Sequence, residues 1–153
     1  MILESNSFQN EGKIPVKYTC DGDNITPHLK WSSYPLNTRS FALICDDPDA
    51  PIGTWVHWIL FNIPMNINEF QENFNLEDYH SQGIKAGYNN FRRIEYGGPC
   101  PPGGEHRYYF KLYALDTIIG ADHGITKKQL LTLIEGHVLT SCQIMGTYEK
   151  KRR

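Results

Sequence analysis

Glycine and proline interrupt this 153-residue chain throughout, with 13 glycines and 9 prolines spread along its length. Both residues interrupt helices and the interiors of strands, so we expect turns and loops along the whole chain. A long helical periodicity of apolar residues is missing until residue 126. The pattern favours a β-rich fold with long loops, and we expect residues 1–153 to form one domain.

Three segments predict buried strands because they are rich in β-branched, aromatic and aliphatic residues. They are Ser40–Cys45, Thr54–Ile63 and His106–Leu115. The first two are almost continuously apolar, so we expect other layers to cover both of their faces. Weaker strand candidates span residues 1–5, 17–20 and 145–150.

The single helix that we expect with a clear signal begins after Thr126. Its hydroxyl can cap the helix, and Gln129 completes a capping-box pattern. An apolar face follows at Leu130, Leu131, Leu133, Ile134, His137, Val138 and Leu139, with Gly136 as a weak point inside it. Residues 65–79 predict a loop with one short helical turn.

Composition excludes several classes of function. A net charge of −2 provides no basic field, so we expect no nucleic-acid partner. No apolar run is long enough to cross a membrane, and the N-terminus lacks the regions of a secretory signal, so we expect a cytoplasmic location. In that compartment, the scattered cysteines Cys20, Cys45, Cys100 and Cys142 should be free thiols, without the close pairs of a zinc site.

The segment Asp47-Pro48-Asp49-Ala50-Pro51 holds two carboxylates on a stiff turn, because each proline fixes its own φ and restricts the residue before it. His57 follows in an apolar strand, where alternation predicts a shared face with Trp55 and Ile59. Taken alone, the aspartates fit a simple turn and the histidine fits a structural residue bonded to backbone. Together they predict a charged pair that can present a donor to a phosphate.

A second histidine, His106, follows the Gly/Pro-rich segment 97–104 and begins a strand. Backbone N–H groups of such a loop can form an anion-binding nest, although the Gly-Lys-Ser/Thr ending of a nucleotide P-loop is missing. Exposure at a strand edge is the alternative interpretation of His106. Two histidines and two aspartates could also be metal ligands, but their spacing does not indicate a metal site.

Taken in order, these motifs resemble those of the phosphatidylethanolamine-binding protein family, which includes Raf kinase inhibitor protein, and its bacterial and archaeal branch in particular. The likeness covers nearly the whole chain. It rests on residues 21–31 (Asp-Gly-Asp-Asn-Ile-Thr-Pro-His-Leu-Lys-Trp), 47–51, 55–58 (Trp-Val-His-Trp), 97–102 (Gly-Gly-Pro-Cys-Pro-Pro), 106–108, 136–139 and 146–148. His28 departs from the family, which usually has proline there.

The resemblance implies a mainly β fold: a sandwich of two packed sheets with Greek-key connections and peripheral helices, including the C-terminal one. It also implies one small anion pocket near the surface, such as family members use for phosphoethanolamine head groups, phosphorylated peptides or simple oxyanions. By motif position, the ligand-binding residues are Asp47, Asp49, His57, His106, Pro101 and Tyr108, with Trp55 beside the pocket.

The first functional hypothesis is therefore a binding protein for phosphate-like anions that is not an enzyme and uses no cofactor or metal. The partner would be a phosphorylated small molecule or a phosphorylated side chain. A second hypothesis is a regulator of a kinase or protease that uses the pocket rim and Phe91–Tyr96. A third, less favoured, is a hydrolase or metal enzyme built on the same histidines and aspartates. The resemblance also implies a homodimer.

Overall fold

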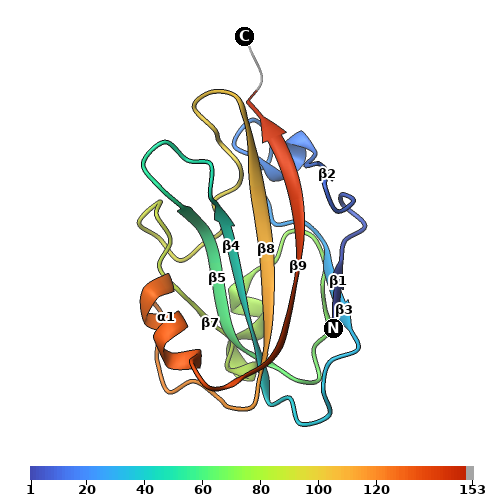
Figure 1. Ribbon diagram of the computed structural model, residues 1–153, viewed down its shortest axis with the longest axis vertical. Coiled ribbons are helices and arrows are strands. Elements are labelled where there is room, and N and C mark those ends of the chain that lie inside the picture. Colours follow the sequence, from blue (N-terminus) through green and yellow to red (C-terminus); the bar gives the residue numbers. More distant parts are fainter. Residues whose placement is uncertain (151–153) are drawn as a thin grey trace.

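The computed structural model describes residues 1–150 of the chain, and Figure 1 shows the arrangement of its elements. In chain order they are β1 (Ile2–Glu4), β2 (Gly12–Lys13), the 3-10 helix η1 (Val16–Tyr18), β3 (Leu29–Ser32), β4 (Ser40–Asp47), β5 (Trp55–Pro64), β6 (Glu69–Phe70), the 3-10 helix η2 (Leu76–Gln82), β7 (Lys85–Ala86), β8 (Glu105–Leu115), α1 (Lys127–Ile134) and β9 (Val138–Glu149).

Six strands form the larger sheet in the order β2-β9-β8-β4-β5-β7. All neighbours are antiparallel except β2 and β9. After β4, β5 and β7, the chain returns with β8 beside β4, which is a Greek-key order. As a result, β4 lies at the centre of the sheet, and the residues where β4 ends meet the start of β8.

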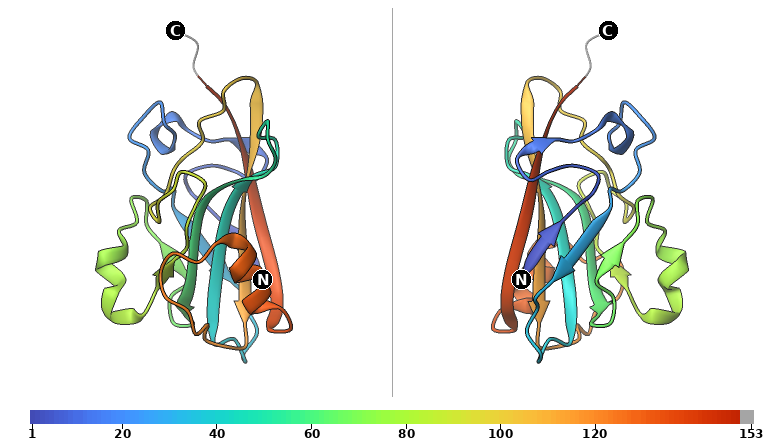
Figure 2. Two further views of the ribbon diagram at one scale, coloured as in Figure 1. Left: turned by 90° about the vertical axis from the view of Figure 1, so that its left-hand side faces the viewer. Right: turned by 90° about the vertical axis from the view of Figure 1, so that its right-hand side faces the viewer.

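The smaller sheet, in the order β1-β3-β6, packs on one face of the larger sheet. Figure 2 shows β1 and β3, in blue, and the η2 segment, in green, on the same side of the large sheet. The core between the layers joins large apolar side chains of both sheets. Among them are Leu29, Trp31 and Phe70 from the small sheet and Phe41, Leu43, Leu60, Phe110 and Leu112 from the large one.

The opposite face of the large sheet has a second apolar cluster, which α1 covers through Leu130 and Ile134. Asp46 is fully buried at this face. Its carboxylate pairs with Lys127 of α1 at 2.7 Å and with Lys111 of β8 at 3.1 Å. Because both faces of the large sheet are covered, every residue of β4 is buried, as its continuous apolar sequence predicts.

The structure confirms the two-sheet fold and its main strands, and it corrects three local predictions. Residues 17–20 form no strand, because η1 follows Pro15 and its turn is closed by Tyr18 N–H donating to Pro15 O. The helix after Thr126 has the expected capping box but ends at Ile134. Residues 138 and 139 belong instead to β9, which extends far upstream of the strand candidate at 145–150.

The prediction of four free thiols is wrong for two of them. Cys20 and Cys100 form a disulfide across a sequence separation of 80, with their Cα atoms 5.4 Å apart. Backbone pairing brings the two segments together, because Cys20 N–H donates to Pro99 O at 3.1 Å. Cys45 and Cys142 are free. No helix among residues 1–150 is long and apolar enough to cross a membrane.

Candidate functional site

A β-bulge positions the first histidine of the site. Cys45 of β4 pairs with Trp58 of β5, and the next β4 residue, Asp46, pairs with Val56. His57 is therefore the extra residue of β5 at this point. A bulge turns the strand and redirects the side chain of its additional residue, so the alternation of faces is broken at His57.

This bulge overturns one prediction from alternation. Ile59 packs in the outer cluster under α1, whereas His57 lies on the inner face against Tyr108, with the two ring centroids 5.2 Å apart. Trp55 does share the side of His57, because both rings contact Phe91 edge-on, at 5.6 and 5.2 Å between centroids. The side chain of His57 is thereby directed to the pocket rather than to the helix-covered face.

The loop after β7 satisfies the backbone that the bulge leaves unpaired. His57 O accepts hydrogen bonds from Gly97 N–H at 3.1 Å and from the side-chain amide of Asn89 at 3.2 Å. The same amide donates to Glu95 O, and Asn89 Oδ1 accepts from Phe91 N–H. Asn89 therefore fixes both the bulged residue and the loop that carries Phe91 beside it.

Gly97 holds the imidazole of His57 in one orientation. Nδ1 of His57 lies 2.6 Å from Gly97 O, and because a carbonyl oxygen can only accept, Nδ1 carries the hydrogen. The Phe91 ring lies directly on Gly97, where a β-carbon would come within 2.4 Å of the ring. Only glycine fits at this position without displacing Phe91, which explains one of the two glycines before Pro99.

The second imidazole is oriented by a carboxylate. Asp47, the last residue of β4, places Oδ2 2.7 Å from Nδ1 of His106 on the adjacent strand β8. The other carboxylate oxygen accepts from Asp49 N–H at 2.7 Å, which closes the turn after β4. Asp47 and His106 are 3% and 6% exposed, so the pair is buried in the wall of the site.

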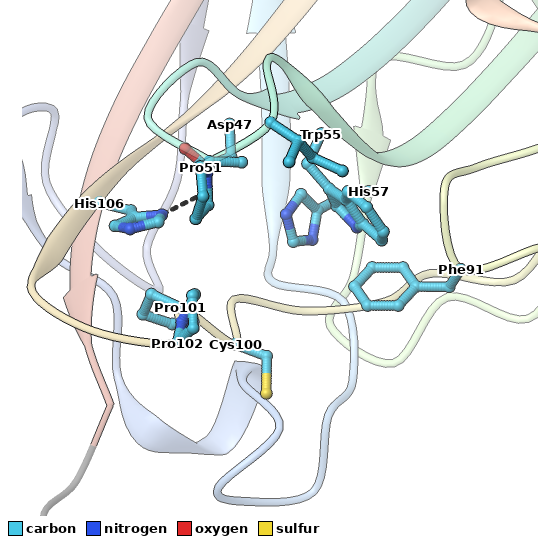
Figure 3. Close-up of a pocket in the computed structure, with 11 residues that line it drawn as sticks. Asp47, Pro51, Trp55, His57, Phe91, Cys100, Pro101, Pro102 and His106 are labelled. Atoms are coloured by element: carbon cyan, nitrogen blue, oxygen red, sulfur yellow. Dashed lines mark hydrogen bonds and ion pairs between the residues drawn. The ribbon is translucent and has the colours of Figure 1, made fainter.

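These side chains share one cavity of about 330 Å³, shown in Figure 3. Both imidazoles line it, and in each the protein already uses Nδ1, so Nε2 is the atom left for a ligand. The rest of the wall is mainly apolar. The lining comprises Asp47, Ala50, Pro51, Ile52, Trp55, His57, Phe91, Cys100, Pro101, Pro102 and His106. The wall has no hydroxyl group, and its cysteine is in the disulfide.

Asp49 is placed outside this lining. Its carboxylate forms a two-pronged pair with the guanidinium of Arg107, at 2.8 and 2.9 Å, and also accepts from Arg107 N–H. These hydrogen bonds lower the pKa of Asp49 to about 2. The observed contacts tie the turn after β4 to the start of β8, and a ligand contact by Asp49 stays a prediction.

Tyr108 lies behind the two imidazoles rather than in the lining. Its ring is 5.2 Å from His57 and 6.5 Å from His106, between centroids, and it is almost fully buried. Burial raises the pKa of the Tyr108 hydroxyl, and the nearby Asp47 carboxylate adds to that effect. We infer that Tyr108 supports both rings from the core side.

Burial also controls the charge of the first imidazole. His57 is 3% exposed, and desolvation lowers its pKa, against the opposing effects of the Gly97 carbonyl and the Asp47 carboxylate. The neutral ring presents a lone pair at Nε2, and the protonated ring presents a donor there. Within residues 1–150, no three His, Cys, Asp or Glu side chains are grouped to hold a metal ion.

Sequence reasoning did not place Phe91 or Pro102 in the pocket. The segment Phe91–Tyr96 was expected at the rim as a partner surface, but Phe91 lines the cavity and Tyr96 is buried in the core, while the two arginines between them are exposed. Gly97 is the sequence signal that could have placed Phe91 in the pocket, because its missing side chain makes room for the Phe91 ring. His28 is buried and has a structural role, since its Nδ1 accepts from Asn6 N–H at 3.0 Å and its Nε2 lies 2.6 Å from Glu69 Oε2.

Comparison with known proteins agrees with this architecture. A family model described as phosphatidylethanolamine-binding protein matches residues 4–149. A UPF0098 protein of Methanothermobacter thermautotrophicus is 45% identical over 150 residues, which cover 98% of this chain and 99% of the relative. A UPF0098 protein of Aquifex aeolicus is 46% identical over 153 residues, covering 98% and 89%.

Solved structures give the same result. CT736 of Chlamydia trachomatis, described as a homologue of the phosphatidylethanolamine-binding protein, superposes with a TM-score of 0.90 at 38% identity and 97% coverage of both chains. YbcL of Escherichia coli, described as a member of the mammalian family, has a TM-score of 0.89 at 31% identity, covering 97% and 98%. This chain belongs to the phosphatidylethanolamine-binding protein family.

Proposed function

We propose that this protein binds phosphate monoesters or similar oxyanions in the cavity between His57 and His106, without catalysing a reaction. The observation that carries the proposal is the shared orientation of the two imidazoles. In both, a protein acceptor occupies Nδ1 and leaves Nε2 for a ligand in the same cavity. Protonated imidazoles donate charge-assisted hydrogen bonds, which suit the oxygens of a phosphoryl group.

The composition of the wall supports a binding role. The lining has no hydroxyl, free thiol or amine, and of its possible nucleophiles the imidazoles of His57 and His106 and the carboxylate of Asp47 already bond to protein groups. The apolar wall formed by Trp55, Phe91 and Pro101 suits the organic part of a small phosphorylated compound. In an ester such as phosphoethanolamine, the phosphate would contact the imidazoles, and the ammonium would lie against the aromatic faces of Trp55 and Phe91, which attract cations.

The charge of His57 couples the proposed binding to pH. The lowered pKa of His57 makes the neutral ring predominant in the free protein at neutral pH. An anion next to Nε2 stabilises the imidazolium and raises this pKa in the complex. The anion is thus expected to bind more tightly as the pH falls below neutrality and to bring a proton with it.

Calorimetric titration with phosphoethanolamine at about pH 6.5 tests the proposal, because this pH lies at the usual pKa of histidine. We expect saturable binding that His57→Ala and His106→Ala each weaken about tenfold or more, the loss of one charge-assisted hydrogen bond. His80→Ala is the matched control, because His80 is exposed on η2 and lies outside the cavity lining. Equal affinity in all four proteins, or no binding by the unaltered protein, would reject the proposal.

A further inference from the structure

The disulfide forms part of the proposed binding site. Cys100 lines the cavity, and its sulfur points away from the imidazoles in Figure 3, toward the N-terminal segment that carries Cys20. Cys20 lies two residues after η1 and is half-buried. One wall of the cavity is therefore covalently attached to a segment 80 residues away in sequence.

Hydrogen bonds hold this loop on one side of Cys100 only. Before it, Gly98 N–H donates to the side chain of Asn24 at 2.8 Å, and Pro99 O accepts from Cys20 N–H at 3.1 Å. After it, residues 101–104 make no hydrogen bond or ion pair with the described part of the chain. These residues include the cavity prolines Pro101 and Pro102, so the disulfide is the attachment nearest to them.

Beyond Pro101, which is buried, the segment after the disulfide is loosely packed. Pro102, Gly103 and Gly104 are exposed, and no atom lies within 4 Å of a β-carbon placed on either glycine. Nothing therefore packs around these glycines to keep them in place. β8 begins immediately afterwards with Glu105 and His106. A displacement of residues 100–104 would open the wall opposite the turn after β4 and alter the entrance to His106.

The geometry points to Cys20–Cys100 as a thiol–disulfide exchange site through which a dithiol reductant lowers the affinity of the cavity for phosphorylated ligands. Both cysteines are half-buried, so an external thiolate can reach the bond. The inference rests on the proposed function for its ligand. The movement of the wall does not depend on which ligand binds.

The exchange is balanced in two steps. A thiolate of the reductant attacks one sulfur, forming a mixed disulfide and releasing the other cysteine as a thiolate. The second thiol of the reductant then resolves the mixed disulfide, forms the oxidised cyclic product and releases the second cysteine. Two electrons and two protons pass from the dithiol to Cys20 and Cys100, which become two thiols.

Affinity then depends on how often the released wall occupies the closed position. If the reduced protein occupies it for about a tenth of the time, the measured Kd rises about tenfold. Reoxidation restores the covalent attachment and the original Kd. The change is local, because the paired strands β4 and β8 do not depend on residues 100–104 for their hydrogen bonds.

Two measurements on the Cys142→Ser protein test the inference, since this change removes the half-buried free thiol and leaves the disulfide. Hydrogen exchange is compared before and after treatment with dithiothreitol, with alkylation and mass spectrometry confirming two new thiols. Because Pro101 and Pro102 have no N–H, the amides that report on this loop are bonded ones beside it. We expect faster exchange at Cys20 N–H, which donates to Pro99 O, and at Glu105 and His106, with continued protection in β4 and in the rest of β8. Unchanged exchange, or a loss of protection throughout the chain, would overturn the local opening.

Calorimetry with phosphoethanolamine is the second measurement. We expect the reduced protein, and Cys20→Ser/Cys100→Ser, to bind about tenfold more weakly than the oxidised protein, as the population argument gives. Equal Kd values would overturn the inference. If the oxidised protein does not bind phosphoethanolamine, the proposed function is wrong, and so is the inferred effect of the disulfide on affinity. The hydrogen-exchange measurement would still show whether reduction opens the wall.

Discussion

Replacing Gly97 by alanine tests whether the wall of the pocket depends on the absence of a side chain at this position. The added β-carbon would lie 2.4 and 2.5 Å from two carbons of the Phe91 ring. Non-bonded carbons normally approach to about 3.5–4.0 Å, so the ring must retreat by about 1 Å. That movement would disturb its edge contacts with Trp55 and His57.

The magnitude follows from this overpacking. Forcing an extra methyl group into a packed site destabilises proteins by about 1–3 kcal/mol. Alanine also reduces the freedom of the unfolded chain, which stabilises by about 0.4–1 kcal/mol and offsets part of the loss. Gly97 has no positive φ, so backbone strain adds nothing. We expect Gly97→Ala to lower the free energy of unfolding by about 1–2 kcal/mol and to weaken anion binding.

Urea unfolding of four proteins separates the clash from other effects. The set is the unaltered protein, Gly97→Ala, Phe91→Ala and the double variant. If the Phe91 ring causes the loss, Gly97→Ala is nearly neutral once the ring is removed, and the coupling energy is about 1 kcal/mol or more. Gly103→Ala is the control, because open space surrounds that position. An equal loss with and without the ring would refute the reasoning.

Three further predictions concern charged groups of the site. Anion binding should take up about one proton near neutral pH, so the calorimetric enthalpy of binding should depend on the ionisation enthalpy of the buffer. If His57→Gln takes up the same proton, His57 is not the group that becomes protonated. Asp47→Ala should destabilise by about 1–3 kcal/mol in urea unfolding, because it leaves the buried Nδ1 of His106 without its hydrogen-bond partner; an unchanged free energy of unfolding would count against that pairing. Asp49→Asn should lose only about 0.5–1 kcal/mol at pH 7, because Arg107 is half-exposed. The pKa of Asp49 is lower in the folded protein than its value of about 3.9 in the unfolded chain, so its ionised carboxylate stabilises the fold at any pH above about 3.9. This stabilisation is lost as the pH falls through about 2, where the folded carboxylate becomes protonated. A stability difference between the unaltered protein and Asp49→Asn that persists below that pH would argue against the pairing with Arg107.

The strand predictions are correct where the apolar composition of a segment matches its burial in the fold. The segment around Leu43 is continuously apolar, and it became the central strand with both faces covered. Prediction failed where a local turn competes with propensity. Val16 and Tyr18 favour strands by residue type, but the turn that begins at Pro15 sets their backbone.

The end of α1 illustrates a different limit. Val138 and Leu139 continue an apolar spacing that fits a helix, yet Glu135 leaves the helical region and Gly136 adopts a φ of 80°. The chain then turns back, and Val138 pairs with Leu115 of β8. The gain comes from twelve residues of β9 pairing along the large sheet, which no local window of sequence contains.

The disulfide was missed for the same physical reason. Spacing along the chain and an expected compartment were the only guides to Cys20 and Cys100. Their proximity results from the contact between the η1 segment and the loop at Pro99, which is a property of the assembled fold. Connectivity between distant cysteines cannot be deduced from spacing alone.

The position of His57 shows the same limit of sequence-based prediction at the proposed binding site. A strict period of two would place its ring with Ile59 under α1, away from Asp47 and His106. One extra residue in β5 reverses the phase and directs the ring to the pocket, and the loop at Asn89 and Gly97 stabilises that bulge through the backbone. No residue type in Trp-Val-His-Trp specifies a bulge, so alternation could not find it. Motif matching placed His57 in the pocket because it compares positions in related chains, in which the bulge is already included.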